Sequence, residues 1–473
     1  MAKLSIRRVI PIVLFSMVFV LAVRQSVSID PDLWWHLKAG QQIIDTRSIP
    51  HTDDYSFTKQ GSEWVAHEWL SEVIMQAIYR VTGLTGLVTI FSLIIVIALW
   101  LTYRRCEGRP YAASIAIVLA AAASSPLFGV RPQMLTLLLA SVYIALLEHF
   151  DTRRIWWLVP LMLLWVNLHA GFALGLALIG LYLVRAVLDR EWNEVRPLLI
   201  SLIVCAAVVP LNPNGFRMFS YPYETLTSPS MAAFIQEWAS PDFHKTTYLP
   251  LAILLLSTFA AMALSPKRPR PGEIFLVLIT ALGALRSVRH IPIFSLFAAP
   301  VLAKHLWAIA KERGWDELLT GAEARPDGLK LLINIILLLA PLVLAVTRIY
   351  HFASHQRNYE TLRNPVAAVE FLKSQHLPGP IYNRYGWGGY LIYQLYPEYR
   401  VYIDGRADVY GDAFFTEAMQ VYDGVGNWKE PLDRYGIQTV IIDNDVALST
   451  ALRNDKEWSN VYEDDQAVIF RRR

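Results

Sequence analysis

Long runs of apolar residues dominate the first 350 residues of the chain. They lie at about 9–23, 86–103, 110–128, 134–150, 155–168, 171–188, 197–211, 246–264, 272–286, 291–310 and 329–349. A helix needs about 20 apolar residues to cross a bilayer, and several of these runs are shorter or contain proline. Each run predicts a membrane helix, which gives about eleven spans.

Basic residues recur in every second segment between the runs, namely Arg104–Arg109, Asp151–Arg154, Arg185–Arg196, Lys267–Arg270 and Lys311–Lys330. Because cytoplasmic loops are enriched in Lys and Arg, this alternation predicts a cytoplasmic N-terminus. The first run follows Lys3, Arg7 and Arg8, and Arg24-Gln25 stands where a signal peptide would have its cleavage site. We therefore expect an uncleaved first span.

The composition agrees with a membrane protein, because 54% of the residues are hydrophobic and 18% are charged, whereas soluble proteins carry about a quarter charged residues. The net charge of +3 gives no reason to expect a nucleic-acid partner. Cys106 and Cys205 are not spaced as metal ligands, and we expect no disulfide between them. We predict a multi-pass protein of the plasma (inner) membrane, with the lipid bilayer as its surroundings.

Two segments on the expected exoplasmic side are long enough to fold. The first outer loop covers about 25–85 and belongs to a predicted transmembrane domain at 1–350. From 351 to 473 the apolar residues become periodic, with a helix expected at 364–375 and strands at 381–383, 400–403, 439–443, 459–462 and 467–471. This alternation predicts a small exoplasmic α/β domain.

The first outer loop begins Ile29-Asp30-Pro31-Asp32-Leu33-Trp34-Trp35-His36-Leu37-Lys38. Tryptophans are common at membrane interfaces, and Asp30 can cap a helix that has Pro31 in its first turn. Capping leaves Asp32 unexplained. Farther on, His67-Glu68 is expected in the first turn of a helix that begins near Val65, and it lacks the second His of a zinc-protease motif.

Asp32, the aromatic pair, His36-x-Lys38, Ile49-Pro50-x-x-Asp53 and Gly61 together resemble the first outer loop of C-type membrane glycosyltransferases. That superfamily includes oligosaccharyltransferase catalytic subunits and protein O-mannosyltransferases. The resemblance implies a multi-span enzyme that takes a sugar from a polyprenyl-phosphate or pyrophosphate donor, with Asp32 as general base or metal ligand and Asp30 as a second acid. His67-Glu68 stands where the oligosaccharyltransferases carry an Asp-x-Asp or Glu-x-Asp pair. A divalent cation, Mg²⁺ or Mn²⁺, is the one cofactor that the resemblance leaves open.

Three arginines, Arg131, Arg286 and Arg289, fall at helix ends on the side where the charge rule disfavours them. Each cluster alone is explained by turn chemistry or by the end of a span. Together they predict an anionic ligand, because the guanidinium group matches phosphate oxygens in a bidentate way. We expect these arginines, with His169 and His290, to bind the donor phosphate.

The leading hypothesis is that Asp32, assisted by Asp30 or Glu68, activates an acceptor hydroxyl. Residues expected to contact the acceptor, which is a protein, a lipid or a glycan, are His36, His67, Glu237, Arg406 and Asp408. Arg406 and Asp408 follow the end of an expected strand, where α/β folds bind ligands. The alternatives are a non-catalytic scaffold or polysaccharide-assembly protein with a degenerate fold, and a transporter. Transport is disfavoured because the polar clusters lie at helix ends and no repeat is found.

Overall fold

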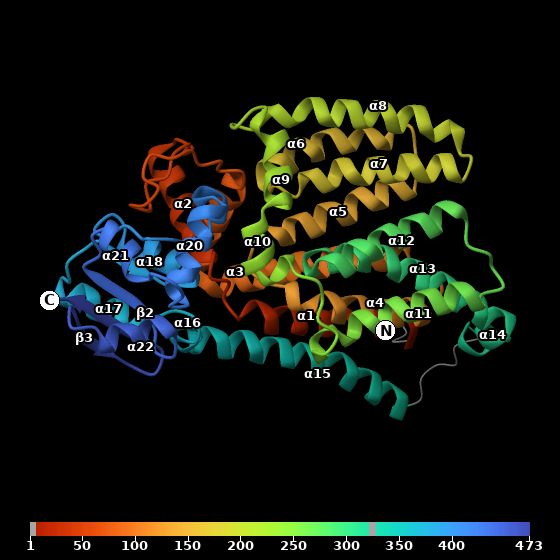
Figure 1. Ribbon diagram of the computed structural model, residues 1–473. Helices are drawn as coiled ribbons and strands as arrows, with labels where there is room; N and C mark the ends of the chain where they lie inside the picture. The colour runs from red at the N-terminus through yellow and green to blue at the C-terminus, as the bar shows by residue number, and fades with distance from the viewer. Residues whose placement is uncertain (1–5, 321–327) are drawn as a thin grey trace. The chain divides into compact units, whose positions relative to one another are not determined.

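The computed structural model describes residues 6–320 and 328–473, and the chain divides into two compact units (Figure 1). The helical unit contains the residues up to Val27, Val88–Met218 and Ile235–Ser354, and the mixed unit contains Ser28–Leu87, Phe219–Phe234 and His355–Arg473. Lys3 and part of the expected basic loop Lys311–Lys330 lie outside the described residues. The division into domains at 1–350 and 351–473 stays a prediction. By its contacts, Ser28–Leu87 groups with the C-terminal segment.

All eleven apolar runs are helical. The helices are α1 (Ile6–Ser26), α3 (Trp69–Arg105), α4 (Tyr111–Ser124), α5 (Gln133–Glu148), α6 (Leu158–Leu168), α7 (Phe172–Leu188), α8 (Trp192–Val208), α11 (Leu249–Leu264), α12 (Pro271–Arg286), α13 (Ile291–Glu312) and α15 (Gly328–Ser354). A helix satisfies its backbone polar groups internally, as a lipid environment requires. Among the described residues, six helical segments are long and apolar enough to cross a membrane, and they contain α1, α3, α8, α11, α13 and α15. The exact number of spans stays a prediction.

Shorter elements connect these helices. They are the single-turn helices η1 (Ser125–Leu127), η2 (Arg154–Trp157), η3 (Val209–Leu211), η4 (Gln236–Trp238), η5 (Thr246–Tyr248) and η6 (Val288–His290), and the helices α9 (Arg217–Thr227), α10 (Pro229–Phe234) and α14 (Trp315–Thr320). The start of α5 meets the end of α6, where the Trp165 indole donates a hydrogen bond to the Thr136 hydroxyl (2.9 Å). The end of α12 meets η4, where the Ser287 hydroxyl donates to the Glu237 carbonyl (2.9 Å). Segments expected as outer loops are thus joined within the helical unit.

A four-stranded sheet forms the centre of the C-terminal part of the mixed unit. Its strands are β1 (Ile381–Asn383), β2 (Thr439–Asp443), β3 (Trp458–Glu463) and β4 (Ala467–Arg472), in the order β1-β2-β4-β3, with β1 and β2 parallel and the other pairs antiparallel. The helices of this part are α16 (Gln356–Thr361), α17 (Val366–Gln375), α18 (Gly388–Leu395), α19 (Ala407–Tyr410), α20 (Asp412–Tyr422), α21 (Lys429–Arg434) and α22 (Ala447–Asn454), with η7 (Tyr385–Trp387) before α18. The expected small α/β fold is confirmed.

The expected strand at 400–403 is wrong. Residues 401–403 are buried, but the isolated β-bridge of this segment joins Val401 to Ser56 of the first loop. The side chain of Asn383 takes the place of a neighbouring strand, because its carbonyl accepts the Tyr402 N–H (2.9 Å) and its amide donates to the Ile403 carbonyl (2.8 Å). A side-chain amide carries the same donor and acceptor as a peptide group, so the backbone is satisfied without a strand.

The first outer loop packs into the mixed unit through α2 (Leu33–Thr46). Trp34 and Trp35 are 1% and 6% exposed, so neither ring faces a membrane interface as the sequence suggested. The Trp34 ring lies 5.3 Å from the rings of both Tyr390 and Tyr393. The aromatic pair is therefore part of the core of the mixed unit.

Candidate active site

The two aspartates of the first loop have different surroundings. The Asp30 carboxylate accepts a hydrogen bond from the backbone N–H of Asp32 (2.9 Å) in the turn before α2. Asp32 is the N-cap residue of α2, and its side chain makes no capping bond to the described helix. A Cβ on Gly405 would lie 1.8 Å from Asp32 Oδ1. Glycine is therefore needed at 405 for the carboxylate of Asp32 to lie where it does.

Further carboxylates gather near Asp32 and form what we call the acidic cluster, which consists of Asp30, Asp32, Asp404 and Asp408. Burial, followed by the negative charges of these four aspartates, raises the pKa of Tyr385 well above its ordinary value. The Tyr385 hydroxyl donates to the Gly405 carbonyl (3.2 Å). The cluster joins the start of α2 to the segment from Asp404 to Asp408.

Asp408 is half-buried. Burial raises its pKa, although the charges of His67 and Arg406 and a hydrogen bond with Tyr221 act in the opposite direction. Tyr221 comes from α9, and its ring packs against the imidazole of His67 at a tilt of 35°, with 4.5 Å between the ring centroids. Of the residues expected to contact an acceptor, His67 and Asp408 are thus brought together within the mixed unit.

Glu68 lies between two histidines. One of its oxygens is 3.2 Å from His67 Nε2 and the other is 3.5 Å from His36 Nε2. The opposite nitrogen of His36 is 3.5 Å from Glu72, a residue that the sequence analysis did not single out. The expected helix near Val65 begins at Trp69, so His67 and Glu68 lie in the turn before α3.

Both of these histidines favour the protonated form. Burial alone would lower the pKa of His36, but its hydrogen bond to Glu72 and the charges of Glu68, Glu72 and Asp32 outweigh burial and raise the pKa. The pKa of His67 is raised in the same way, because burial is outweighed chiefly by Glu68. The two imidazoles can therefore hold the Glu68 carboxylate in place and exchange protons with it.

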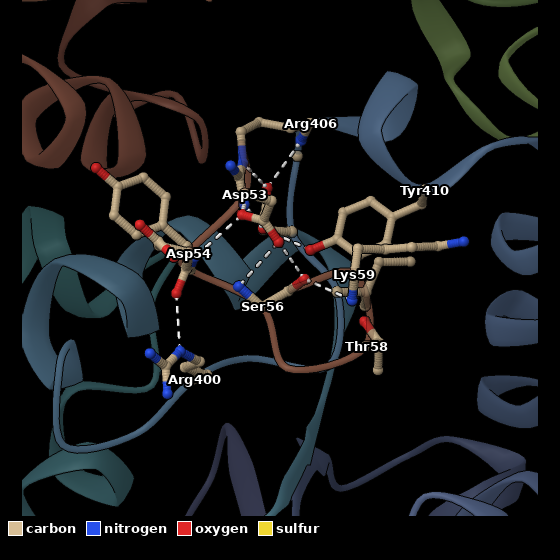
Figure 2. A network of polar contacts seen from close by, with 12 residues as sticks. Asp53, Asp54, Ser56, Thr58, Lys59, Arg400, Arg406 and Tyr410 are labelled. Carbon is tan, nitrogen blue, oxygen red and sulfur yellow. Dashed lines mark hydrogen bonds and ion pairs between the residues drawn. The ribbon is translucent and has the colours of Figure 1, made fainter. Parts of the chain in front are cut away.

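Arg406 belongs to a buried ion network between the first loop and the C-terminal part of the mixed unit (Figure 2). Its guanidinium group lies 2.7 Å from Asp53 and 2.7 Å from Asp404, and all three side chains are at most 1% exposed. The Tyr410 hydroxyl also donates to Asp404 (2.6 Å), and the Ser56 hydroxyl donates to Asp53 (2.5 Å). The geometry gives Arg406 a holding role, and its expected contact with an acceptor stays a prediction.

A second set of candidate residues, the arginine cluster, lies in the helical unit and consists of Arg131, Arg289, Glu237 and Trp238. Arg131 forms an ion pair with Glu237, and the Arg289 guanidinium lies 4.8 Å from the centre of the Trp238 ring. Burial would raise the pKa of Glu237, but the charges of Arg131 and Arg289 outweigh burial and lower it. An acidic residue of the protein thus supplies part of the negative charge that the sequence led us to expect from a ligand.

The other expected phosphate-binding residues also lie in the helical unit. His169 Nδ1 accepts the Gly171 N–H (2.8 Å) and lies 2.8 Å from the Thr136 hydroxyl. Because Nδ1 accepts, the ring is neutral and carries its hydrogen on Nε2. Arg286 is exposed, and His290 is half-buried in η6.

The described residues contain no group of three or more His, Cys, Asp or Glu side chains arranged to hold a metal ion. Glu68, for example, is close to His36 and His67, but His67 Nδ1 lies 3.1 Å from the Val65 carbonyl and its Nε2 faces Glu68. These side chains, as they are arranged, therefore do not form a binding site for a divalent cation.

Several solved structures are similar to the chain over most of its length. The archaeal oligosaccharyltransferase AglB from Archaeoglobus fulgidus, in complex with an inhibitory peptide and a dolichol-phosphate, is 10% identical, with a TM-score of 0.50, and the match covers 91% of this chain and 69% of AglB. ArnT from Cupriavidus metallidurans in the apo state is 15% identical, with a TM-score of 0.50 and 97% of each chain covered. No family model matches the sequence, and no curated protein matches it.

Both of these proteins are C-type membrane glycosyltransferases. The chain has the C-type glycosyltransferase fold. The resemblance stated from the sequence is thereby confirmed at the level of the fold. On this fold, seven of the expected residues belong to the mixed unit (Asp30, Asp32, His36, His67, Glu68, Arg406 and Asp408) and six belong to the helical unit (Arg131, His169, Glu237, Arg286, Arg289 and His290).

Sequence reasoning gave no site role to four side chains of these networks, namely Asp53, Glu72, Tyr385 and Asp404. Asp53 was noticed only as part of the Ile-Pro-x-x-Asp pattern, and Asp404 only as a neighbour of Arg406. Glu72 lies four residues after Glu68, the spacing that puts two side chains on one face of a helix. This spacing could have indicated from the sequence alone that Glu72 lies beside Glu68.

Proposed function

We propose that the protein is a membrane glycosyltransferase that moves a sugar from a polyprenyl-phosphate-linked donor to an acceptor hydroxyl on the exoplasmic side. Three findings support the proposal: the C-type fold, the acidic cluster at the start of α2, and the arginine cluster of the helical unit. AglB in complex with a dolichol-phosphate supports a lipid phosphate as the carrier of the sugar.

Asp32 is the proposed general base. Its carboxylate takes the proton of the acceptor hydroxyl, and the oxygen attacks the anomeric carbon of the sugar. The bond between that carbon and the phosphate oxygen breaks, and its electron pair leaves with the lipid phosphate. A single displacement of this kind inverts the anomeric configuration. No step of the proposed reaction uses a metal ion.

The observation that carries the proposal is the position of the Asp32 carboxylate. It lies at the N-terminus of α2 against Gly405, among the four carboxylates of the acidic cluster. Glu68, held by His36 and His67, is the proposed second acid–base group of the mixed unit.

Arg131, Arg286 and Arg289 are the proposed donor-phosphate ligands, together with His169 and His290. Their role in the reaction is electrostatic, because a departing phosphate gains negative charge that cationic groups stabilise. The neutral His169 can donate a hydrogen bond through Nε2. The remaining residues, His36, His67, Glu237, Arg406 and Asp408, are proposed to contact the acceptor. Four of them have charged partners within the protein, so an acceptor must compete with those partners.

The test uses purified full-length protein in nanodiscs. Mass spectrometry of the lipids that copurify with the protein identifies the polyprenyl-phosphate sugar, which then serves as substrate in an assay for release of polyprenyl phosphate. Asp32→Asn should retain the lipid and lose release by at least about 100-fold, the usual contribution of a general base. Asp45→Asn is the matched control, because Asp45 lies on the same helix and forms an exposed pair with Arg80.

Two outcomes would contradict the proposal. If wild-type protein neither copurifies with a lipid phosphate nor binds one that is added, the donor class is wrong. If the wild type releases polyprenyl phosphate and Asp32→Asn does so at the same rate, Asp32 is not the base. A protein that binds the lipid without turnover would instead fit the non-catalytic alternative.

A further inference from the structure

Glu72 is a buried carboxylate that the proposed reaction does not use. It lies in the first turn of α3, and its side chain is 1% exposed. One of its oxygens, Oε1, is 3.5 Å from His36 Nδ1. The other, Oε2, is buried and accepts no hydrogen bond from the residues that the structure describes. Because an ionised carboxylate is costly to bury without a charged partner, Glu72 depends on His36.

A close approach of two helices places Glu72 beside His36. His36 lies in the first turn of α2, and Gly40 lies one turn later on the same helix. A Cβ on Gly40 would lie 2.1 Å from the Glu72 carbonyl oxygen and 2.9 Å from Gln76 Cβ. Only a residue without a Cβ lets the backbone of α2 approach α3 this closely. The main chains of both helices therefore fix the pair.

The His36 ring has a carboxylate beside each of its nitrogens. Nδ1 faces Glu72, and Nε2 is 3.5 Å from Glu68 Oε2. A neutral imidazole has one N–H group and one lone pair, whereas an imidazolium has two N–H groups. If both carboxylates are ionised, a neutral ring turns its lone pair toward one of them. The imidazolium is therefore the form of His36 that can donate to both carboxylates.

Burial and charge act in opposite directions on His36. Burial lowers its pKa, but Glu72, Glu68 and Asp32 outweigh burial and raise it. Burial raises the pKa of Glu72, and His36 opposes this effect. Other titratable groups that face the pair are Asp32, Tyr55, His67 and Glu68. A change at Glu72 should therefore change how firmly His36 holds its second proton, because the two groups titrate together.

We propose that Glu72 is a positioning residue of the acid–base site, which keeps His36 doubly protonated so that its Nε2–H holds the Glu68 carboxylate. This inference rests on the proposed function, in which Glu68 is the second acid–base group. His67 Nε2 is 3.2 Å from the other Glu68 oxygen, so each oxygen has an imidazole beside it. A carboxylate held in one orientation needs less reorganisation to exchange a proton with a substrate.

The first measurement is the titration of His36 in the full-length protein in detergent, by NMR of histidines labelled with ¹³C at Cε1. The His36 signal is the one that is absent from the spectrum of His36→Gln. In wild type the ring should stay protonated above pH 6.5, the ordinary midpoint. Glu72→Gln keeps the size of the side chain and removes its charge. It should move the midpoint to lower pH, because fewer negative charges then oppose burial.

The second measurement is the rate of polyprenyl phosphate release at different pH values, with the copurified polyprenyl-phosphate sugar as substrate in nanodiscs. Release should fall as the pH rises through the His36 midpoint, because a neutral ring no longer donates to both carboxylates. In Glu72→Gln this fall should come at lower pH. The rate at neutral pH should drop by on the order of tenfold, less than the loss of an acid–base group itself. A purely structural role would lower the rate by one factor at every pH.

Two variants serve as controls. Glu72→Asp retains the charge, so it should keep the His36 midpoint above that of Glu72→Gln and restore release toward the wild-type rate. Asp45→Asn removes a carboxylate from another pair between α2 and α3, in which Asp45 and Arg80 lie 2.8 Å apart with side chains 52% and 41% exposed. It should leave the midpoint and the pH dependence of release unchanged.

The outcomes separate the inference from the proposed function. If wild type releases no polyprenyl phosphate, both fail. If wild type is active and His36 titrates at the same pH in wild type and Glu72→Gln, the inference alone is overturned. The same holds if the midpoint moves but Glu72→Gln lowers release by one factor at every pH. A His36 ring that is mostly neutral at pH 6.5 in wild type also overturns the inference, and that result does not depend on whether the Glu72 variants fold.

Discussion

Replacement of Arg406 by Met tests whether the buried ion network holds the mixed unit together. Methionine has a similar length and no charge, so Arg406→Met leaves Asp53 and Asp404 as two carboxylates without their counter-ion. Both carboxylates are 0% exposed, so water cannot replace the guanidinium group. The variant also loses the cation–π contacts of the guanidinium group with the rings of Tyr55 (5.0 Å) and Trp64 (4.7 Å).

The size of the loss follows from the bonds that remain. Breaking a buried ion pair by removing one partner costs about 3–5 kcal/mol. Asp404 keeps hydrogen bonds from the Tyr410 hydroxyl and from the backbone N–H of residue 406. Asp53 keeps bonds from the Ser56 hydroxyl and two backbone N–H groups. These bonds favour the lower end of the range, about 3 kcal/mol, which lowers the melting temperature of a unit of 150–250 residues by about 6–12 °C.

The destabilisation should depend on pH. Burial would raise the pKa of Asp404, but Arg406 outweighs burial and lowers it. In wild type the carboxylate therefore stabilises the fold at a pH above its unfolded-state pKa, and this stability is lost as the pH falls through the folded-state pKa. In Arg406→Met the guanidinium no longer opposes burial, and only the hydrogen bonds from Tyr410 and the backbone N–H of residue 406 still lower the pKa of Asp404, so its pKa rises and protonation relieves the variant. The difference between the two proteins should be largest at neutral pH and should shrink in acid.

The assay is thermal unfolding in detergent, followed by tryptophan fluorescence, for wild type, Arg406→Met and the control Arg453→Met. Arg453 pairs with Glu463 at 2.9 Å, with side chains 34% and 45% exposed, and such pairs contribute about 0–1 kcal/mol. If Arg406→Met melts within 2 °C of wild type at neutral pH, or if its deficit grows in acid, the reasoning about the network is refuted.

Three further predictions concern the mixed unit. Gly405→Ala puts a Cβ 1.8 Å from Asp32 Oδ1 and should abolish release of polyprenyl phosphate. The control Gly386→Ala, whose new Cβ would have its nearest neighbour 3.9 Å away, should retain release. Equal release rates for the two variants would argue against the placement of Asp32. His36→Gln removes an imidazole whose pKa is raised despite burial, so the variant should lack the stability that the charged imidazole provides below pH 6.5. The difference in melting temperature between wild type and variant should disappear as the pH rises through the folded-state pKa of His36. A constant difference in melting temperature across this pH range would contradict the raised pKa. Trp34→Ala, at a site 1% exposed, should cost about 3–5 kcal/mol in the free energy of unfolding, measured by the same melts; a loss below 1 kcal/mol would place the ring outside the core.

The helices could be predicted from the sequence because each is a local feature. A run of apolar residues such as 134–150 forms a helix in a membrane whatever its neighbours are, since no other local structure satisfies the backbone. Four of the strands, including Thr439–Asp443, could be predicted for a similar reason, because short β-branched and aromatic runs pair within one sheet. The segment 400–403 has the same composition, but its partners are the backbone of Tyr55 and Phe57 in the first loop and the side chain of Asn383, which composition does not reveal.

The site could be predicted only in part, because its contacts join residues far apart in the chain. Asp32 could be singled out from its position after the first apolar run and from the resemblance of this loop to C-type glycosyltransferases, and its role stays a prediction. The Arg131–Glu237 pair joins residues 106 positions apart, so the sequence showed a cationic cluster and concealed its counter-ion. Arg406 was expected to contact an acceptor because it follows the end of an expected strand, and its burial depends on Asp53, which lies in another part of the mixed unit.

The grouping of Ser28–Leu87 with His355–Arg473 in one compact unit has a topological consequence. Two segments that fold against each other must lie on the same side of the membrane, so the chain between them must cross the membrane an even number of times. An odd number of membrane crossings between the two segments is therefore incompatible with the fold. The ten apolar runs from 86–103 to 329–349 give an even number. It also means that the surroundings of Asp32, which include Gly405, stay incomplete during synthesis until the final segment has been delivered to that side.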